Sequence, residues 1–155
     1  MYIFGFLNTY KISSQILFVA NTKRVLIESP FKGKDWSETR RNILYARLCV
    51  RDSILRGEAP FASHLFYTQT GILDDKIEEE RMRGINAGLT WGEDAQLSAF
   101  YQDFGFSRGM EYGLKHAQEV GRPIEKRSLG SSEEVYFLLE EMAKKEPFIP
   151  TGILF

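Results

Sequence analysis

One stretch of the chain constrains the fold more than any other, and it runs from Leu97 to Pro123. It begins with an apolar run, Leu97 to Tyr101, that is typical of a buried strand. A turn containing Gly105 follows, and Ser107, two residues before Gly109, stands where the N-cap of a helix is expected. Apolar residues recur beyond it at helical spacing, at Met110, Leu114 and Ala117. A strand that leads through a short turn into a helix is the building unit of an α/β domain.

The expected start of this helix is a candidate anion site. The first N–H groups of a helix lack partners within it, and the positive end of the helix dipole lies at the same place. Where such a terminus faces a crevice, it binds phosphate. This reasoning assigns a phosphate-binding role to Ser107, Arg108, Gly109 and Met110. The alternative is that Ser107 only caps the helix.

Short apolar runs and helical patterns alternate along most of the chain. The expected strands are residues 24–29, 59–62, 97–101 and 123–125, and the expected helices are residues 37–56, 78–91, 107–120 and 133–145. This alternation predicts a doubly wound α/β domain whose mostly parallel sheet has about four to five strands flanked by helices. Ser37 is the expected N-cap of the first helix, and a long polar and aromatic connection follows the second strand.

The chain of 155 residues suits one domain with a single core. We expect an N-terminal extension over residues 1–22, the α/β domain over residues 23–146 and an apolar tail over residues 147–155. A signal peptide is disfavoured because no basic segment precedes the first apolar run, and the run from Ile16 to Ala20 is too short to cross a membrane. Cys49, the only cysteine, is expected to be a buried thiol in a reducing, cytoplasmic compartment.

The net charge of the chain and the placement of its histidines limit the kinds of partner and ligand that we expect. The net charge of −1 gives no reason to expect a nucleic-acid polymer. His64 and His116 have no cysteine partners at zinc-binding spacing, so we expect no metal and no cofactor. No membrane partner is expected either.

In a doubly wound sheet, ligands bind beyond the carboxyl ends of the strands. Three segments are predicted to meet there, at residues 30–34, 63–75 and 103–110. Lys32 and Lys34 bring positive charge to the first segment, and Arg40 follows in the first helical turn. His64 comes directly after the second strand, where a bond to nearby backbone is the alternative to a ligand contact.

These segments together resemble the nucleoside 2-deoxyribosyltransferase-like superfamily, and small bacterial and phage members of it in particular. The matching pieces are VLIESPFKG, GEAPFASHLFYTQTGILDD, EEERMRGINAGLTWGEDA and SRGMEYGLKHAQEVGRPIEKR. They cover the chain from about Arg24 to Leu129, in the order that the superfamily has them. The resemblance implies a flavodoxin-like domain that forms a homo-oligomer, a dimer or larger, and binds a nucleoside or a nucleoside monophosphate.

The resemblance also implies roles for individual residues. The first loop corresponds to the loop that flanks base and sugar, and it comprises Ser29, Pro30, Phe31, Lys32 and Gly33. Ser107 and Gly109 match the turn that holds the 5′-phosphate. Enzymes of the superfamily cleave the N-glycosidic bond with a glutamate nucleophile six residues after that serine. Here the corresponding position is Gly113, and the family's assisting aspartate falls near Asn86.

A missing nucleophile leaves three hypotheses open. The first is a nucleotide-binding protein without the usual nucleophile, which in a phage could sequester a nucleotide signal of host defence. The second is an N-glycosidase or deoxyribosyltransferase with relocated carboxylates; Glu111 and Asp103 are the first candidates, with Asp74 and Asp75 as others. The third is a structural or interaction protein, suggested by the apolar ends of the chain.

Overall fold

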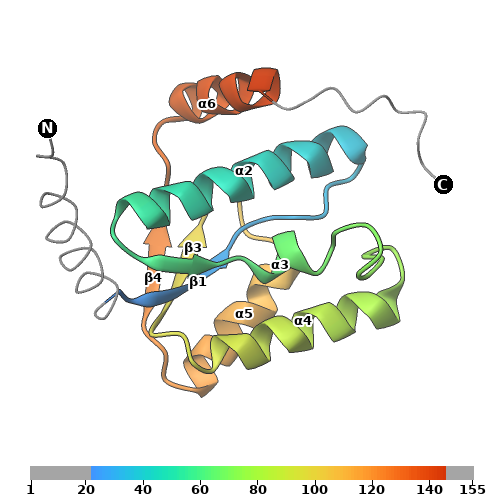
Figure 1. Cartoon of the computed structure of the whole chain (residues 1–155), viewed down its shortest axis with the longest axis vertical. Coiled ribbons are helices and arrows are strands. Elements are labelled where there is room, and N and C mark those ends of the chain that lie inside the picture. Colours follow the sequence, from blue (N-terminus) through green and yellow to red (C-terminus); the bar gives the residue numbers. More distant parts are fainter. Residues whose placement is uncertain (1–21, 146–155) are drawn as a thin grey trace, which may run out of the picture.

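Four strands and five helices alternate along residues 22–145, the part of the chain that the computed structural model describes (Figure 1). The strands are β1 (Arg24–Glu28), β2 (Ala59–Phe61), β3 (Leu97–Tyr101) and β4 (Ile124–Arg127). The helices are α2 (Trp36–Leu55), α3 (Ser63–Phe66), α4 (Glu78–Gly92), α5 (Arg108–Glu119) and α6 (Ser132–Lys145).

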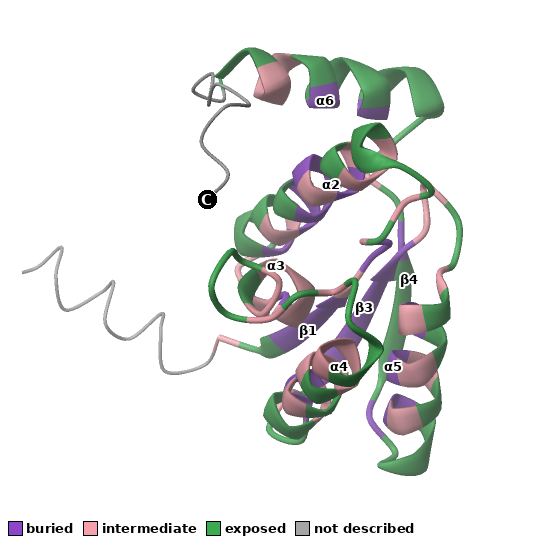
Figure 2. Ribbon diagram, turned by 90° about the vertical axis from the view of Figure 1, so that its right-hand side faces the viewer, coloured by how far each residue is buried: buried purple, intermediate pink, exposed green. Residues whose placement is uncertain are grey.

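The strands form one parallel sheet in the order β2-β1-β3-β4. Helices α2 and α6 cover one face of the sheet, and α4 and α5 cover the other (Figures 1 and 2). The chain changes its winding direction after β2, because right-handed crossovers carry α2 to one face and α4 and α5 to the opposite face. The predicted α/β class and parallel sheet are therefore confirmed, and the arrangement is consistent with a flavodoxin-like fold.

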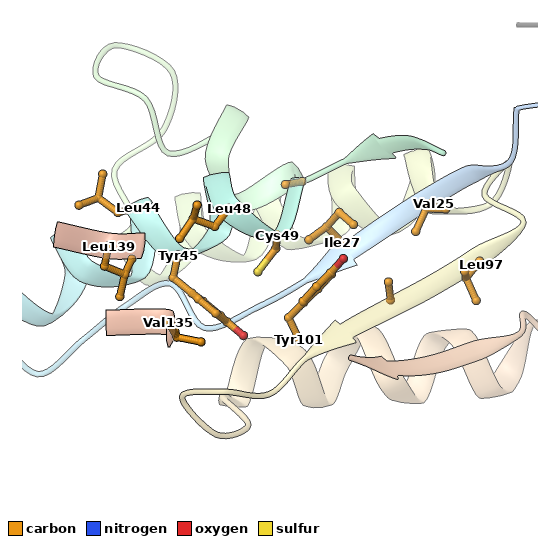
Figure 3. Close-up of a cluster of buried hydrophobic side chains, with 12 residues drawn as sticks. Val25, Ile27, Leu44, Tyr45, Leu48, Cys49, Leu97, Tyr101, Val135 and Leu139 are labelled. Carbon is orange, nitrogen blue, oxygen red and sulfur yellow. The ribbon is translucent and has the colours of Figure 1, made fainter. Parts of the chain in front are cut away.

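The side chains of β1 point alternately to the two faces of the sheet. Val25 and Ile27 pack on the side of α2, where they join Tyr45, Cys49 and Tyr101 in the main core (Figure 3). Successive side chains of a strand point to opposite faces. Leu26 and Glu28 therefore point toward α4 and α5, so that a carboxyl group stands on the face where apolar side chains are the rule.

Three differences from the predicted elements exceed a shift of one residue at an end or change a cap. Asp35 caps α2 in place of Ser37, because its Oδ1 accepts a hydrogen bond from the Glu38 N–H at 2.8 Å. The long connection after β2 contains the short helix α3. Strand β4 extends to Arg127, since its pairing with β3 continues to Tyr101. The predicted cap at Ser107 is confirmed.

The expected extension over residues 1–22, apart from Thr22, and the expected tail over residues 147–155 lie outside the described residues. Within residues 22–145, no helix has the length and apolar character that crossing a membrane requires. The cytoplasmic location stays a prediction.

Helices α3 and α4 pack closely through Gly88, which leads to a first testable prediction. A Cβ atom at this position would lie 2.5 Å from Ser63 Oγ and 2.8 Å from Ser63 Cβ, so α3 would have to move. We expect Gly88→Ala to lower the free energy of unfolding by about 1 to 2 kcal/mol in urea titrations. Gly109→Ala is the matched control, because a Cβ there meets only Ser107 Oγ at 3.8 Å. Equal stability of the two variants would contradict the tight packing of α3 on α4.

Candidate functional site

A cavity of about 440 Å³ opens beyond the carboxyl end of β1, on the face of the sheet that α4 and α5 cover. Its size is that of a small-molecule site, for which about 300 to 1,000 Å³ is typical. The wall includes residues from the β1 end and first loop, from α3 and the loop after it, from α4 and from the start of α5. The three segments that the sequence predicts to meet at this edge thus all contribute to one cavity.

The first loop and α3 are joined across the cavity by Ser29 and His64. Ser29 Oγ and His64 Nε2 are 2.9 Å apart, and the ring of Phe31 meets the imidazole edge to face. Burial lowers the pKa of His64 to about 4, so the imidazole is neutral at pH 7. A neutral imidazole offers one donor and one acceptor, which suits recognition of hydroxyl groups and base edges better than binding of an anion.

Glu28 places a carboxyl group in the wall of the same cavity. Among the described residues, no donor makes a hydrogen bond to this carboxylate, and Arg122 is the one charge that acts on it appreciably. Burial raises the pKa of Glu28 to about 8, and the positive charge of Arg122 opposes that rise. Glu28 therefore carries its proton at neutral pH and can donate a hydrogen bond into the cavity.

The Glu28 side chain occupies the space that a side chain at position 113 would need. Gly113 lies on the buried face of α5, and a Cβ atom built there would be 2.6 Å from Glu28 Cδ. Helix α5 approaches β1 so closely at this point that only glycine leaves room for the carboxyl group. Glu28 and Gly113 are thus a complementary pair, one filling the volume that the other vacates.

The N-terminus of α5 borders the cavity through Ser107, Arg108, Gly109 and Met110. Ser107 Oγ accepts a hydrogen bond from the Met110 N–H at 3.4 Å, which is long for such a bond. Four cationic side chains also contribute to the wall: Lys32, Lys34, Arg81 and Arg108. A helix N-terminus and cationic side chains both favour an anion, so this part of the cavity is a candidate anion-binding site.

Asp75 and Arg81 connect the second loop to α4 at the cavity wall. Their side chains pair at 3.5 Å, and Lys32 Nζ donates a hydrogen bond to the Asp75 carbonyl oxygen at 3.4 Å. Burial raises the pKa of Asp75, while Arg81 and Lys32 counteract this effect. Through these contacts Lys32, Asp75 and Arg81 connect the loop after β1, the loop before α4 and α4 itself at the cavity wall.

Nine of the residues assigned to ligand binding line the cavity. They are Ser29, Phe31, Lys32, Gly33, His64, Ser107, Arg108, Gly109 and Met110. The glycine of the first loop is required by its surroundings, because a Cβ at Gly33 would lie 2.5 Å from Glu38 Cβ and 2.7 Å from the Thr39 nitrogen.

Five other assigned residues lie outside the cavity lining. Pro30 is buried beside the cavity, and Arg40, Asn86 and Glu111 are exposed on the surfaces of α2, α4 and α5. Asp103 accepts hydrogen bonds from the Tyr45 and Ser128 hydroxyls and from the Leu129 N–H. It anchors the end of β3 to the segment before α6, which is a structural task. Neither Glu111 nor Asp103 is therefore placed to react with a ligand in this cavity.

Glu28, which has the most unusual environment in the cavity, was not among the residues predicted from the sequence. Its signal was a charged residue closing an otherwise apolar buried strand, and a glycine at position 113 on the buried stripe of the facing helix. Arg81 was not predicted either, and Asn86 was the one residue of α4 that was assigned to the site. Within residues 22–145, no group of three or more histidine, cysteine, aspartate or glutamate residues is placed to hold a metal ion.

Comparison with known proteins gives one match. A family model described as "Domain of unknown function (DUF7768)" matches residues 23–127, which include both walls of the cavity from β1 to α5. No curated protein and no solved structure matches the chain. The resemblance to the nucleoside 2-deoxyribosyltransferase-like superfamily stays a prediction.

Proposed function

Because the chain belongs to the family described as a domain of unknown function, DUF7768, we propose its function from the cavity itself: it binds a nucleoside 5′-monophosphate. The observation that carries this proposal is that one cavity contains both a candidate phosphate site and polar side chains that can form hydrogen bonds with hydroxyl groups. The N-terminus of α5 forms the candidate phosphate site, and the polar side chains are those of Glu28 and the Ser29–His64 pair.

The candidate anion-binding site supports a phosphate group rather than a neutral ligand. Unpartnered N–H groups of a helix start favour a doubly charged phosphate, and Arg108 and Lys32 add positive charge at the cavity wall. Arg108 is exposed and makes only a 3.5 Å contact with the Tyr112 hydroxyl, so it is free to turn toward a ligand. A phosphate at this place would meet donors from both backbone and side chain.

The remainder of the cavity supports a sugar and a base. Apolar and aromatic side chains lie along it, from Leu26, Tyr67, Leu73, Ile85 and Leu89. Such surfaces pack against the faces of a nucleobase. Ser29, His64 and the protonated Glu28 offer polar groups where hydroxyls of a sugar would lie. Binding of this kind needs no catalysis, in keeping with a protein that sequesters a nucleotide.

Ser107→Asp tests the placement of the phosphate. Aspartate is as good an N-cap as serine, so α5 is expected to form, but its charge repels a phosphate. A nucleoside monophosphate at 100 times its Kd adds about 2.7 kcal/mol of stability to the wild type. We expect the thermal shift to vanish in Ser107→Asp.

Ser131→Asp is the matched control, because Ser131 caps α6 by accepting a hydrogen bond from the Glu134 N–H at 3.3 Å and does not line the cavity. The control is expected to keep the full shift. An undiminished shift in Ser107→Asp would refute the phosphate placement, and no shift of the wild type with any nucleoside or nucleotide would refute the proposed function.

We further propose that the protein is a homo-oligomer. Among residues 22–145, four large hydrophobic side chains are more than three-fifths exposed: Trp36, Leu55, Trp91 and Phe137. Exposed aromatic groups of this size are enriched at subunit interfaces. Sedimentation of the full chain measures the state directly, and a monomer at all concentrations would contradict the proposal.

A further inference from the structure

Three charged residues at the cavity wall contact one another only loosely. Arg81 Nε is 3.5 Å from Asp75 Oδ1, and Lys32 Nζ donates a hydrogen bond of 3.4 Å to the Asp75 carbonyl oxygen. A close contact between a cationic nitrogen and a carboxylate oxygen measures about 2.7 to 2.9 Å. The buried pair of Arg127 with Glu58 reaches 2.7 Å in the same protein. Asp75 therefore lies near two cations without the close geometry of a structural ion pair.

This loose contact is nevertheless shielded from water. The side chains of Arg81 and Asp75 are 15% and 21% exposed. Removing two charges from water is unfavourable, and only a close, well-aligned contact offsets that loss. Burial raises the pKa of Asp75, and this effect exceeds the opposing effect of Arg81 and Lys32. The Asp75 carboxylate is thus poorly compensated by the cations beside it.

Arg81 has a second partner at the same long distance. Its Nη1 is 3.5 Å from Glu78 Oε2, and the Glu78 side chain is largely exposed. The charge of Glu78 also acts on Arg108, which begins α5. Arg81, Arg108 and Lys32 all line the cavity. These residues therefore belong to the part of the cavity in which the proposed function places a phosphate.

The contact between Asp75 and Arg81 resembles an anion-binding contact in which the anion belongs to the protein. A guanidinium group binds carboxylate and phosphate through the same N–H donors. A phosphate group has about twice the charge of a carboxylate and three acceptor oxygens. Its contacts with Arg81 would replace two contacts of 3.5 Å, so the exchange favours the phosphate.

We propose that Asp75 competes with the phosphate of the ligand for Arg81, so that a ligand binds by displacing the Asp75 carboxylate. This inference rests on the proposed function and adds to it a control of affinity. Lys32 takes part through its bond to the Asp75 backbone, which a phosphate also replaces. A nucleoside has no anion that competes for these cations, so Asp75 lowers the affinity for phosphate-bearing ligands alone.

The neighbouring residue Asp74 provides a matched control. It lies next to Asp75 in the chain but does not line the cavity. Its Oδ1 accepts a hydrogen bond from the Lys76 N–H at 2.9 Å, which the amide oxygen of an asparagine can also accept. Asp74→Asn and Asp75→Asn each remove one negative charge from the same segment and conserve the shape of the side chain. Only Asp75→Asn removes the proposed competitor.

The test measures the affinity of the full chain for a nucleoside and for its 5′-monophosphate by calorimetry. We expect Asp75→Asn to bind the monophosphate at least about fivefold more tightly than the wild type, because no carboxylate then competes for Arg81. The nucleoside is expected to bind both proteins within about twofold, and Asp74→Asn to match the wild type within about twofold for both ligands. A merely structural role of Asp75 predicts weaker binding of both ligands.

Arg81→Met separates competition from simple repulsion between Asp75 and the ligand. Methionine keeps an unbranched apolar side chain but has no charge. We expect Arg81→Met to bind the monophosphate at least about tenfold more weakly than the wild type. Adding Asp75→Asn to this variant is expected to improve binding by less than about twofold, because the cation for which the carboxylate competes is gone. Repulsion alone would preserve the full gain in affinity.

Two results would overturn the inference. One is a monophosphate affinity of Asp75→Asn equal to or below that of the wild type, and the other is a gain that persists undiminished in the Arg81→Met background. Both leave the proposed binding function intact, because the wild type still binds the monophosphate. Absence of monophosphate binding by the wild type refutes the proposed function, and its absence in Asp75→Asn as well refutes the inference with it.

Discussion

Arg127→Met is expected to lower the free energy of unfolding by about 3 to 5 kcal/mol, measured by urea titration at pH 7. The Arg127 side chain is only 3% exposed, and its two terminal nitrogens pair with the two carboxylate oxygens of Glu58 at 2.7 and 2.8 Å. The Glu58 side chain is itself 13% exposed. Removing the guanidinium leaves this carboxylate buried without its main partner, and that is the costly outcome.

The expected loss is large because the Glu58 carboxylate would stay buried without its partner. A second variant measures this contribution. Adding Glu58→Gln to Arg127→Met removes the uncompensated charge, so the double variant is expected to recover about 1 kcal/mol or more of the loss. Arg83→Met is the control, because Arg83 and Glu79 form a pair at 2.8 Å with side chains 70% and 77% exposed. An exposed pair of this kind contributes less than about 1 kcal/mol. Equal losses for Arg127→Met and Arg83→Met would contradict the structural role of the buried pair.

Glu28→Gln is expected to change how stability depends on pH. Burial raises the pKa of Glu28 from 4.5 to about 8, so between these values the folded state holds a proton that the unfolded state has released. Its contribution therefore makes the free energy of unfolding fall as pH rises toward 8. In the variant this contribution is absent, and its stability relative to the wild type is expected to increase with pH.

The expected change is about 2 to 4 kcal/mol between pH 5 and pH 8, since one extra bound proton corresponds to about 1.4 kcal/mol per pH unit. The difference between variant and wild type is the quantity to measure. His64 is present in both proteins and has the opposite effect on the pH dependence of stability, because burial lowers its pKa from 6.5 to about 4. Its effect cancels in the difference. Urea titrations at several pH values provide the comparison. Parallel curves for the two proteins would show that Glu28 is not protonated in the folded state.

Much of the fold could be predicted from local pattern. β-Branched and apolar residues mark β1, and the helical stripe beyond Ser107 marks α5 almost to its last residue. The parallel sheet follows because strands alternate with helices. The cap of α2 could not be chosen with certainty, since Asp35 and Ser37 both have capping side chains and only the path of the loop selects between them.

The loops that form the candidate site could be predicted from the sequence, but several of the side chains that face the cavity could not. The carboxyl ends of parallel strands meet at one edge, so the three loops could be placed together from sequence alone. Which side chains turn inward depends on register and helix phase. Glu111 lies on the exposed side of α5, whereas Gly113 faces the sheet. Glu28 becomes visible as a partner of Gly113 only when β1 and α5 are set side by side, because 85 positions separate them in the chain.

The central claim is that the start of α5 holds the phosphate of a nucleotide. Calorimetric titration of the wild-type chain with a nucleoside and with its 5′-monophosphate, in the same buffer, measures this most directly. We expect the monophosphate to bind at least about tenfold more tightly, which corresponds to about 1.4 kcal/mol from the phosphate alone. Equal affinities for the nucleoside and its monophosphate would contradict the claim.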